Sequence, residues 1–158
     1  MRTTSGAAVI ALRPTFAEFV LQSVGEPAIA AALCFEITET AAVTSLSSVT
    51  YFMRELKARG CKFSLDDFGT GLSSFMYLKT LPVDFIKIDG QFISHITHDA
   101  VDRSMVEAII KVGRALGIAT IAECVEAAAV LAELQRIGVD FAQGNYVARP
   151  LPIAELSR

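Results

Sequence analysis

Two adjacent carboxylates, Asp66 and Asp67, follow a strand-like apolar run and precede the turn Gly69-Thr70-Gly71. Carboxylates at the end of a strand can bind a metal ion, and a glycine-flanked turn can direct backbone N–H groups toward a phosphate. Asp66 or Asp67 could instead cap a following helix, and the glycines could form a plain turn. This stretch alone leaves both interpretations open.

Further polar residues lie at the ends of other apolar runs, namely Glu36, Lys87, Glu123 and Gln143. The carboxyl ends of parallel strands meet on one face of a (β/α) barrel, so we expect these side chains to converge with Asp66. Several carboxylates crowd together only when cations neutralise them, and oxygen-rich sites suit Mg²⁺ or Mn²⁺. The pattern predicts a two-metal centre of the kind that hydrolyses phosphodiesters. Lys87 could offset charge on the phosphate or pair with a carboxylate.

Short apolar strands alternate with helices along most of the chain. The predicted helices cover residues 14–24, 46–59, 72–78, 101–116 and 126–137. The predicted strands cover residues 33–35, 61–65, 85–89, 118–122 and 139–142. This alternation indicates an α/β fold with parallel strands, because each helix returns the chain to the same edge of the sheet. A doubly wound open sheet would use the same strand ends, so the alternation favours a barrel without excluding that sheet.

Bulk composition excludes several classes of protein. The chain has 158 residues, a net charge of −3 and scattered Lys and Arg residues, which argues against binding long nucleic acid. No apolar run reaches the roughly 18 residues of a membrane-spanning helix. Three widely spaced cysteines predict free thiols and a cytoplasmic location. The hydrophobic fraction of 53% is high and suits buried strands or a piece of a larger core.

Five short motifs occur in order at the ends of the predicted strands. They are Glu36-Ile-Thr-Glu39, Asp66-Asp67-Phe-Gly-Thr-Gly71, Lys87-Ile-Asp89, Ala122-Glu123-Cys-Val-Glu126 and Gln143-Gly144. Together they resemble the successive motifs of the EAL domain, the bacterial cyclic di-GMP phosphodiesterase family. The resemblance implies a TIM-like barrel that opens cyclic di-GMP to linear pGpG with two Mg²⁺ or Mn²⁺ ions. It also implies a homodimer and further signalling domains in the full-length protein.

The resemblance also implies roles for single residues. The implied metal ligands are Glu36, Asp66 and Asp67, with Asp66 bridging both ions. The residues implied to act on the attacking water, or to position it, are Lys87, Glu123 and Gln143. Glu39 would hold the loop from Asp67 to Gly71 in its active shape, a role that the family ties to metal binding and dimerisation. Within that loop, Gly69, Thr70 and Gly71 would face the substrate.

The chain departs from the family pattern in its first part. It contains no Glu-Ala-Leu motif, and residues 1–35 contain no Asn where the family has an Asn ligand. A complete barrel takes about 200 residues or more. We therefore expect an unassigned segment at residues 1–13 and a truncated EAL-type domain at residues 14–158 that lacks the first strands. We expect little turnover from such a chain alone. The alternatives are a non-catalytic module that binds cyclic di-GMP or a protein, and a fragment completed by dimerisation.

Overall fold

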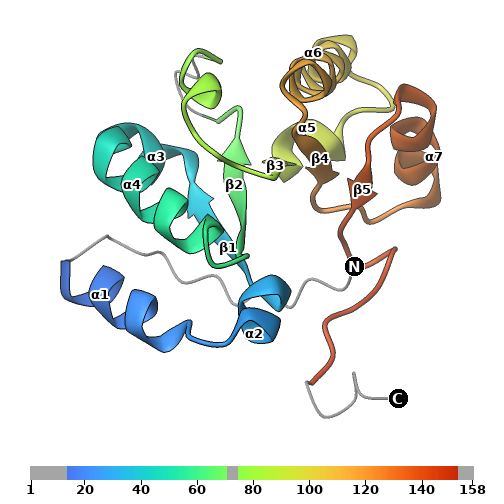
Figure 1. The fold of residues 1–158 in the computed structure, drawn as a ribbon. Coiled ribbons are helices and arrows are strands. Elements are labelled where there is room, and N and C mark those ends of the chain that lie inside the picture. The colour runs from blue at the N-terminus through green and yellow to red at the C-terminus, as the bar shows by residue number, and fades with distance from the viewer. Residues whose placement is uncertain (1–13, 71–74, 153–158) are drawn as a thin grey trace.

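A computed structural model describes residues 14–70 and 75–152, and a parallel sheet forms its centre (Figure 1). The strands are β1 (Cys34–Thr38), β2 (Lys62–Phe68), β3 (Phe85–Ile88), β4 (Ala119–Ala122) and β5 (Phe141–Ala142). They pair in the order β1-β2-β3-β4-β5, and every neighbouring pair is parallel. The predicted α/β fold with five parallel strands is therefore confirmed.

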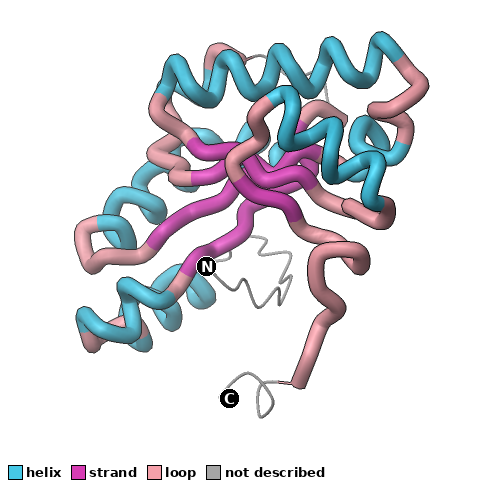
Figure 2. Tube along the Cα trace, turned by 90° about the vertical axis from the view of Figure 1, so that its right-hand side faces the viewer, coloured by secondary structure: helices cyan, strands magenta, loops and turns pink. Residues whose placement is uncertain are grey.

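Helices connect the strands and lie around the sheet (Figure 2). They are α1 (Pro14–Ser23), α2 (Pro27–Ala32), α3 (Glu39–Thr44), α4 (Leu46–Lys57), the 3-10 helix η1 (Tyr77–Lys79), α5 (Gly90–Ser94), α6 (Ala100–Leu116) and α7 (Ala128–Ile137). In Figure 1, α3 and α4 lie on the β1–β2 side of the sheet, and α6 and α7 lie on the β4–β5 side. This is the arrangement expected of successive strand-and-helix units.

Three short helices, α2, α3 and α5, lie outside the predicted helices. Each begins at or next to a residue that favours the first turn or the N-cap of a helix. Pro27 stands in the first turn of α2, where its missing N–H is not needed. The Thr38 side chain accepts a hydrogen bond from the Ala41 N–H in α3, and the Asp89 carboxylate accepts one from the Gln91 N–H in α5. Helices of one or two turns are too short for a recognisable apolar period, so only their caps mark them.

Several other predicted elements differ in extent; β1, for example, continues to Thr38 beyond the predicted end at Phe35. The predicted helix at residues 72–78 lies partly outside the described residues, and of the rest Phe75 and Met76 form a turn before η1 begins at Tyr77. The last strand begins at Phe141 rather than at Val139. The side chain of the intervening Asp140 accepts hydrogen bonds from a neighbouring strand.

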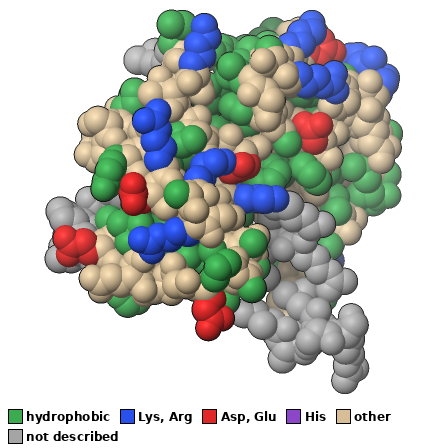
Figure 3. Space-filling model, in the orientation of Figure 1, with side chains coloured by type: hydrophobic (Ala, Val, Ile, Leu, Met, Phe, Trp, Pro, Cys, Tyr) green, Lys and Arg blue, Asp and Glu red, His purple; other side chains and the backbone are tan. Residues whose placement is uncertain are grey.

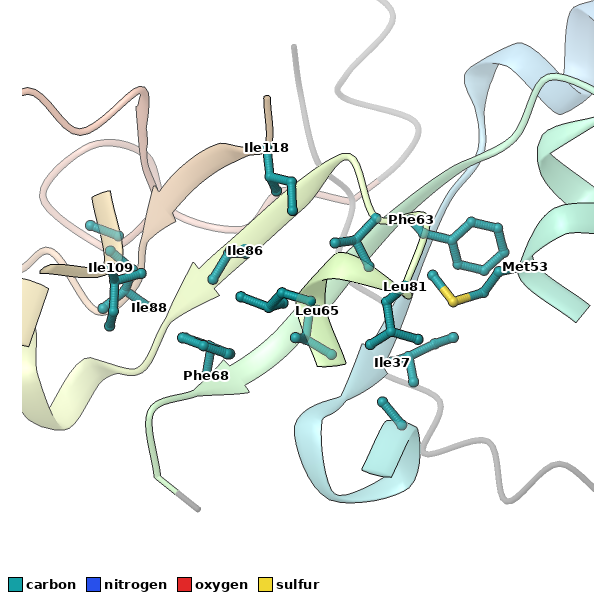
Figure 4. Close-up of a cluster of buried hydrophobic side chains, with 14 of the residues drawn as sticks. Ile37, Met53, Phe63, Leu65, Phe68, Leu81, Ile86, Ile88, Ile109 and Ile118 are labelled. Carbon is teal, nitrogen blue, oxygen red and sulfur yellow. The ribbon is translucent and has the colours of Figure 1, made fainter. Parts of the chain in front are cut away.

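The hydrophobic core lies between the sheet and the helices (Figure 4). Phe63 and Leu65 of β2 and Ile86 of β3 are fully buried, and Met53 of α4 and Ile109 of α6 pack from the helical layer. Side chains alternate between the two faces of a strand, so residues between these apolar positions point to the other face of the sheet. That alternation leaves the other face free for the polar residues of the site.

Two aspartates join neighbouring strands at the edge opposite the predicted site. Asp84 precedes β3, and its Oδ2 accepts a hydrogen bond from the Phe63 N–H at 2.9 Å. Asp140 precedes β5, and its Oδ2 accepts hydrogen bonds from both the N–H and the hydroxyl of Thr120, each at 2.8 Å. These hydrogen bonds hold β2 in register with the start of β3, and β4 in register with the start of β5. The opposite ends of these strands, which carry the site, are aligned as a result.

The surface shows no basic stripe on the face drawn in Figure 3, where Lys and Arg side chains are spread among other side chains. None of the helices within residues 14–70 and 75–152 is long and apolar enough to cross a membrane.

Candidate active site

Lys87, in the middle of β3, is the centre of the site. Its side chain is almost fully buried, and its Nζ contacts three carboxylates: Glu123 Oε1 at 2.6 Å, Asp66 Oδ1 at 2.8 Å and Glu36 Oε1 at 3.2 Å. Glu36 comes from β1, Asp66 from β2 and Glu123 from the residue after β4. The structure thus brings together side chains from four neighbouring strands.

The charges of this cluster depend on one another. Burial acts to lower the pKa of Lys87, but hydrogen bonds with Asp66 and Glu123 outweigh it and raise the pKa above its ordinary value. Burial raises the pKa of Glu123, and the contact with Lys87 works in the opposite direction. A buried charge is tolerated when partners surround it. Lys87 is therefore a permanent counter-ion to the carboxylates.

An irregularity in β2 turns Asp67 toward this cluster. The pairing of β2 with β3 shifts between Leu65 and Phe68, and Asp67 has a left-handed φ of 55°. In a regular strand, adjacent residues such as Asp66 and Asp67 would point to opposite faces. Such bulges re-aim side chains, often next to active sites. The strand, which the sequence predicted to cover residues 61–65, continues to Phe68, because Phe68 is fully buried and pairs with Ile88.

Asp67 thereby joins a group of oxygens that could hold a metal ion. Carboxylate oxygens of Asp66, Asp67 and Glu123 lie within 4.8 Å of one another. Burial raises the pKa of Asp67, and the neighbouring negative charges of Asp66 and Asp89 raise it further. An all-oxygen set of this kind fits Mg²⁺ or Mn²⁺, which would relieve that repulsion. Glu36 contacts Lys87 and is not one of these three residues, so its role as a ligand stays a prediction.

The loop after β2 is held by Glu39, the first residue of α3. Glu39 is buried, and its Oε2 accepts a hydrogen bond from the Gly69 N–H at 3.0 Å. Gly69 has a φ of 103°, a conformation that favours glycine. The Thr70 hydroxyl donates to the Asp67 carbonyl oxygen at 3.0 Å. Gly71, the last residue predicted for this loop, lies outside the described residues.

Gln143 lies against the loop that carries Glu123. Its backbone N–H donates to the Ala122 carbonyl oxygen at 2.8 Å, and its carbonyl oxygen accepts from the Val125 N–H at 3.0 Å. The side-chain Oε1 is buried and meets no hydrogen-bond donor among the described residues. Gly144 follows at a point of close backbone approach, since a Cβ there would lie 2.3 Å from the Val125 N and O atoms. The backbone of Gln143 therefore holds the chain on both sides of Glu123, at Ala122 and at Val125.

Two residues near the site carried no predicted role. Asp89 follows β3, caps α5 through the Gln91 N–H and adds to the negative charge around Asp67. Its position at a strand end was the available signal. Tyr77, in η1, has a buried hydroxyl next to Glu39. No spacing rule points to Tyr77, because the contact depends on how a loop folds back.

A family model that describes the EAL domain matches residues 10–150. The chain belongs to the EAL domain family. The cyclic di-GMP phosphodiesterase PdeB of Shewanella oneidensis is 44% identical over 122 residues, which make up 77% of this chain and 14% of PdeB. Membership confirms the TIM-like fold that the motifs predicted.

Solved EAL structures agree with the fold. The complex of the PaMucR phosphodiesterase with c-di-GMP has a TM-score of 0.77 at 38% identity and covers 88% of this chain and 55% of that chain. A manganese/cy-diGMP complex of BlrP1 from Klebsiella pneumoniae has a TM-score of 0.73 at 26% identity and covers 84% of this chain and 34% of that chain. This EAL chain therefore spans about half of the PaMucR structure and a small part of PdeB.

Proposed function

We propose that this EAL chain forms the metal-binding part of a cyclic di-GMP phosphodiesterase that hydrolyses c-di-GMP to linear pGpG. The observation that carries the proposal is the group of Asp66, Asp67 and Glu123 oxygens beside the buried Lys87. The names of PdeB and of the PaMucR complex support the same substrate.

Asp66 and Asp67 would hold the divalent ions, with Glu36 as a further candidate ligand, and the Glu123 oxygens beside them would face the attacking water. The manganese complex of BlrP1 supports Mn²⁺ as one such ion, and Mg²⁺ suits the same oxygens. When bound, such ions withdraw charge from the phosphate and lower the pKa of water.

The chain's own groups would then orient the reactants. Lys87 keeps Asp66 and Glu123 directed toward the cluster and adds a positive charge near the phosphate. Glu123, with its raised pKa, is suited to accept a proton from the attacking water. Gln143 would position that water through its buried amide oxygen. The loop formed by Gly69, Thr70 and Gly71 would lie along the substrate, with the Gly69 N–H itself bonded to Glu39.

The test combines turnover with binding. The chain is incubated with Mn²⁺ and cyclic di-GMP, pGpG is measured by chromatography, and nucleotide binding is measured by calorimetry. Asp67→Asn should weaken Mn²⁺-dependent nucleotide binding and remove the small turnover expected of this chain, whereas Asp99→Asn should leave both unchanged, because Asp99 only caps α6. Equal activity of the Asp67→Asn variant would contradict the proposal, as would the absence of both turnover and binding.

A second function is a module that binds cyclic di-GMP or a partner protein without cleaving the nucleotide. Nucleotide binding without pGpG would support this alternative.

Assembly and location are also proposed. We propose a homodimer, which light scattering would test, further signalling domains in the full-length protein, and a domain extent of residues 14–158. The free cysteines Cys34, Cys61 and Cys124 suit the reducing cytoplasm.

A further inference from the structure

Tyr77 is a buried polar residue that the proposed function does not use. Its side chain is half-buried, its hydroxyl oxygen is fully buried, and no described residue meets that hydroxyl at full hydrogen-bond geometry. Buried hydroxyls in proteins nearly always have a partner. The position of Tyr77 therefore requires an explanation.

The group that acts most directly on this hydroxyl is the Glu39 carboxylate. Burial raises the pKa of Tyr77 above its usual range, and both hydrogen bonding and charge interaction with Glu39 raise it further. The phenol is therefore protonated and can donate. The carboxylate can only accept, so the two groups have one compatible arrangement.

Glu39 connects Tyr77 to the metal-binding part of the site. One carboxylate oxygen of Glu39 accepts from the Gly69 N–H at 3.0 Å. Gly69 is two residues after Asp67, whose left-handed backbone turns its carboxylate toward Asp66. A carboxylate held by two donors from different segments has less freedom to rotate than one held by a single donor. Tyr77 thus lies at the far end of a chain of contacts that ends at Asp67.

We propose that Tyr77 is a positioning residue, whose hydroxyl donates to Glu39 and, through Glu39 and the Gly69 N–H, keeps Asp67 turned toward the metal-binding oxygens. This inference deepens the proposed function and rests on it for the effect on metal binding. The effect on the Gly69 amide does not depend on metal or substrate, so the two proposals can fail separately.

The first experiment compares Tyr77→Phe with Tyr51→Phe in the metal-free chain. Tyr51 is exposed on α4 and serves as the matched control. Hydrogen exchange of the Gly69 amide, followed by NMR, should be about 3- to 10-fold faster in Tyr77→Phe and unchanged in Tyr51→Phe. The effect is smaller than that of losing a charge-assisted hydrogen bond outright, because it reaches Gly69 only through Glu39. The Phe63 amide, which donates to Asp84, should be unaffected in both. Unchanged Gly69 exchange in Tyr77→Phe would overturn the proposal.

The second experiment measures Mn²⁺ affinity by calorimetry. Tyr77→Phe should weaken binding about 3- to 10-fold. Adding Tyr77→Phe to Glu39→Gln should weaken binding little further, because the proposed route passes through Glu39. Additive losses would overturn the route, even if each variant alone binds weakly. If the wild-type chain binds no Mn²⁺ but Tyr77→Phe still speeds exchange of the Gly69 amide, the proposed function is refuted and the positioning role of Tyr77 is supported.

A third measurement keeps Tyr77 in place and so covers the case in which Tyr77→Phe does not fold. In chain labelled with ¹³C-tyrosine, Glu39→Gln should shift the Cζ resonance of Tyr77 at neutral pH and leave that of the exposed Tyr51 in place. An unchanged Tyr77 Cζ resonance would show that the two groups do not interact and would overturn the proposal.

Discussion

Replacing Lys87 by Met should destabilise the chain, and the loss should depend on pH. Met has a similar length but no charge, so Glu36, Asp66 and Glu123 would face one another without their counter-ion. Removing one member of a buried ion pair costs about 3–5 kcal/mol. The three carboxylates keep 15–18% of their side-chain surface exposed, so solvent reduces this cost. We expect a loss of about 2–4 kcal/mol near neutral pH.

The matched control is Lys57→Met. Lys57 also contacts a carboxylate at 2.6 Å, that of Asp84, but the two side chains are 31% and 29% exposed. Exposed ion pairs contribute about 0–1 kcal/mol. For a chain of this length each kcal/mol corresponds to roughly 2–4 °C in Tm, so the two variants should differ visibly.

The pH dependence gives the sharper test. In the wild type the raised pKa of Lys87 contributes stability that is fully present below the ordinary lysine value and is lost only at more alkaline pH. In Lys87→Met the pKa of Glu123 should rise further, so the penalty is complete at alkaline pH and shrinks as the pH falls and the carboxylates take up protons. Urea denaturation followed by circular dichroism measures both. A variant as stable as the wild type at high pH, or a loss independent of pH, would refute the role of Lys87 as counter-ion.

Three further predictions concern residues around the site. Alkylation of Cys34 by iodoacetamide, followed by mass spectrometry, should be slow at neutral pH and rise steeply toward pH 11. Burial, and then neighbouring carboxylates, raise the pKa of this thiol to about 11. A rate at neutral pH as fast as in the urea-unfolded chain would contradict this. Asp140→Ala should cost roughly 1–3 kcal/mol in urea denaturation, since it removes both hydrogen bonds from Thr120; no change would show that the strands align without it. Gly144→Ala should weaken Mn²⁺ binding in calorimetry and lower the Tm, because a methyl group would overlap the Val125 backbone; unchanged values would exclude a tight contact there.

Most of the fold could be predicted from the sequence because strands and long helices leave periodic patterns. The strands around Phe63 and Ile86 are apolar runs, and α6 combines an apolar stripe with Asp99 at its beginning and Gly117 at its end. The polar ends of those strands then indicated which side chains would converge on Lys87.

What the sequence could not predict depends on backbone geometry and on contacts between distant segments. Alternation along a regular strand would have placed Asp66 and Asp67 on opposite faces. No sequence pattern predicts the left-handed conformation of Asp67. The contact of Tyr77 with Glu39 likewise joins residues whose spacing has no period. The ligand roles of Glu36, Asp66 and Asp67 stay predictions.

The bulge in β2 makes the site sensitive to the number of residues as well as to their kind. A substitution at Asp67 removes one carboxylate and leaves the rest of the strand in place. A deletion of that residue would restore the regular alternation, and the next side chain in line, the apolar Phe68, would then compete for the position of the carboxylate. Variation by insertion or deletion at this point should therefore be far less tolerated than in the loops between helices. A deletion scan through β2 would separate the geometric requirement of the site from its chemical one.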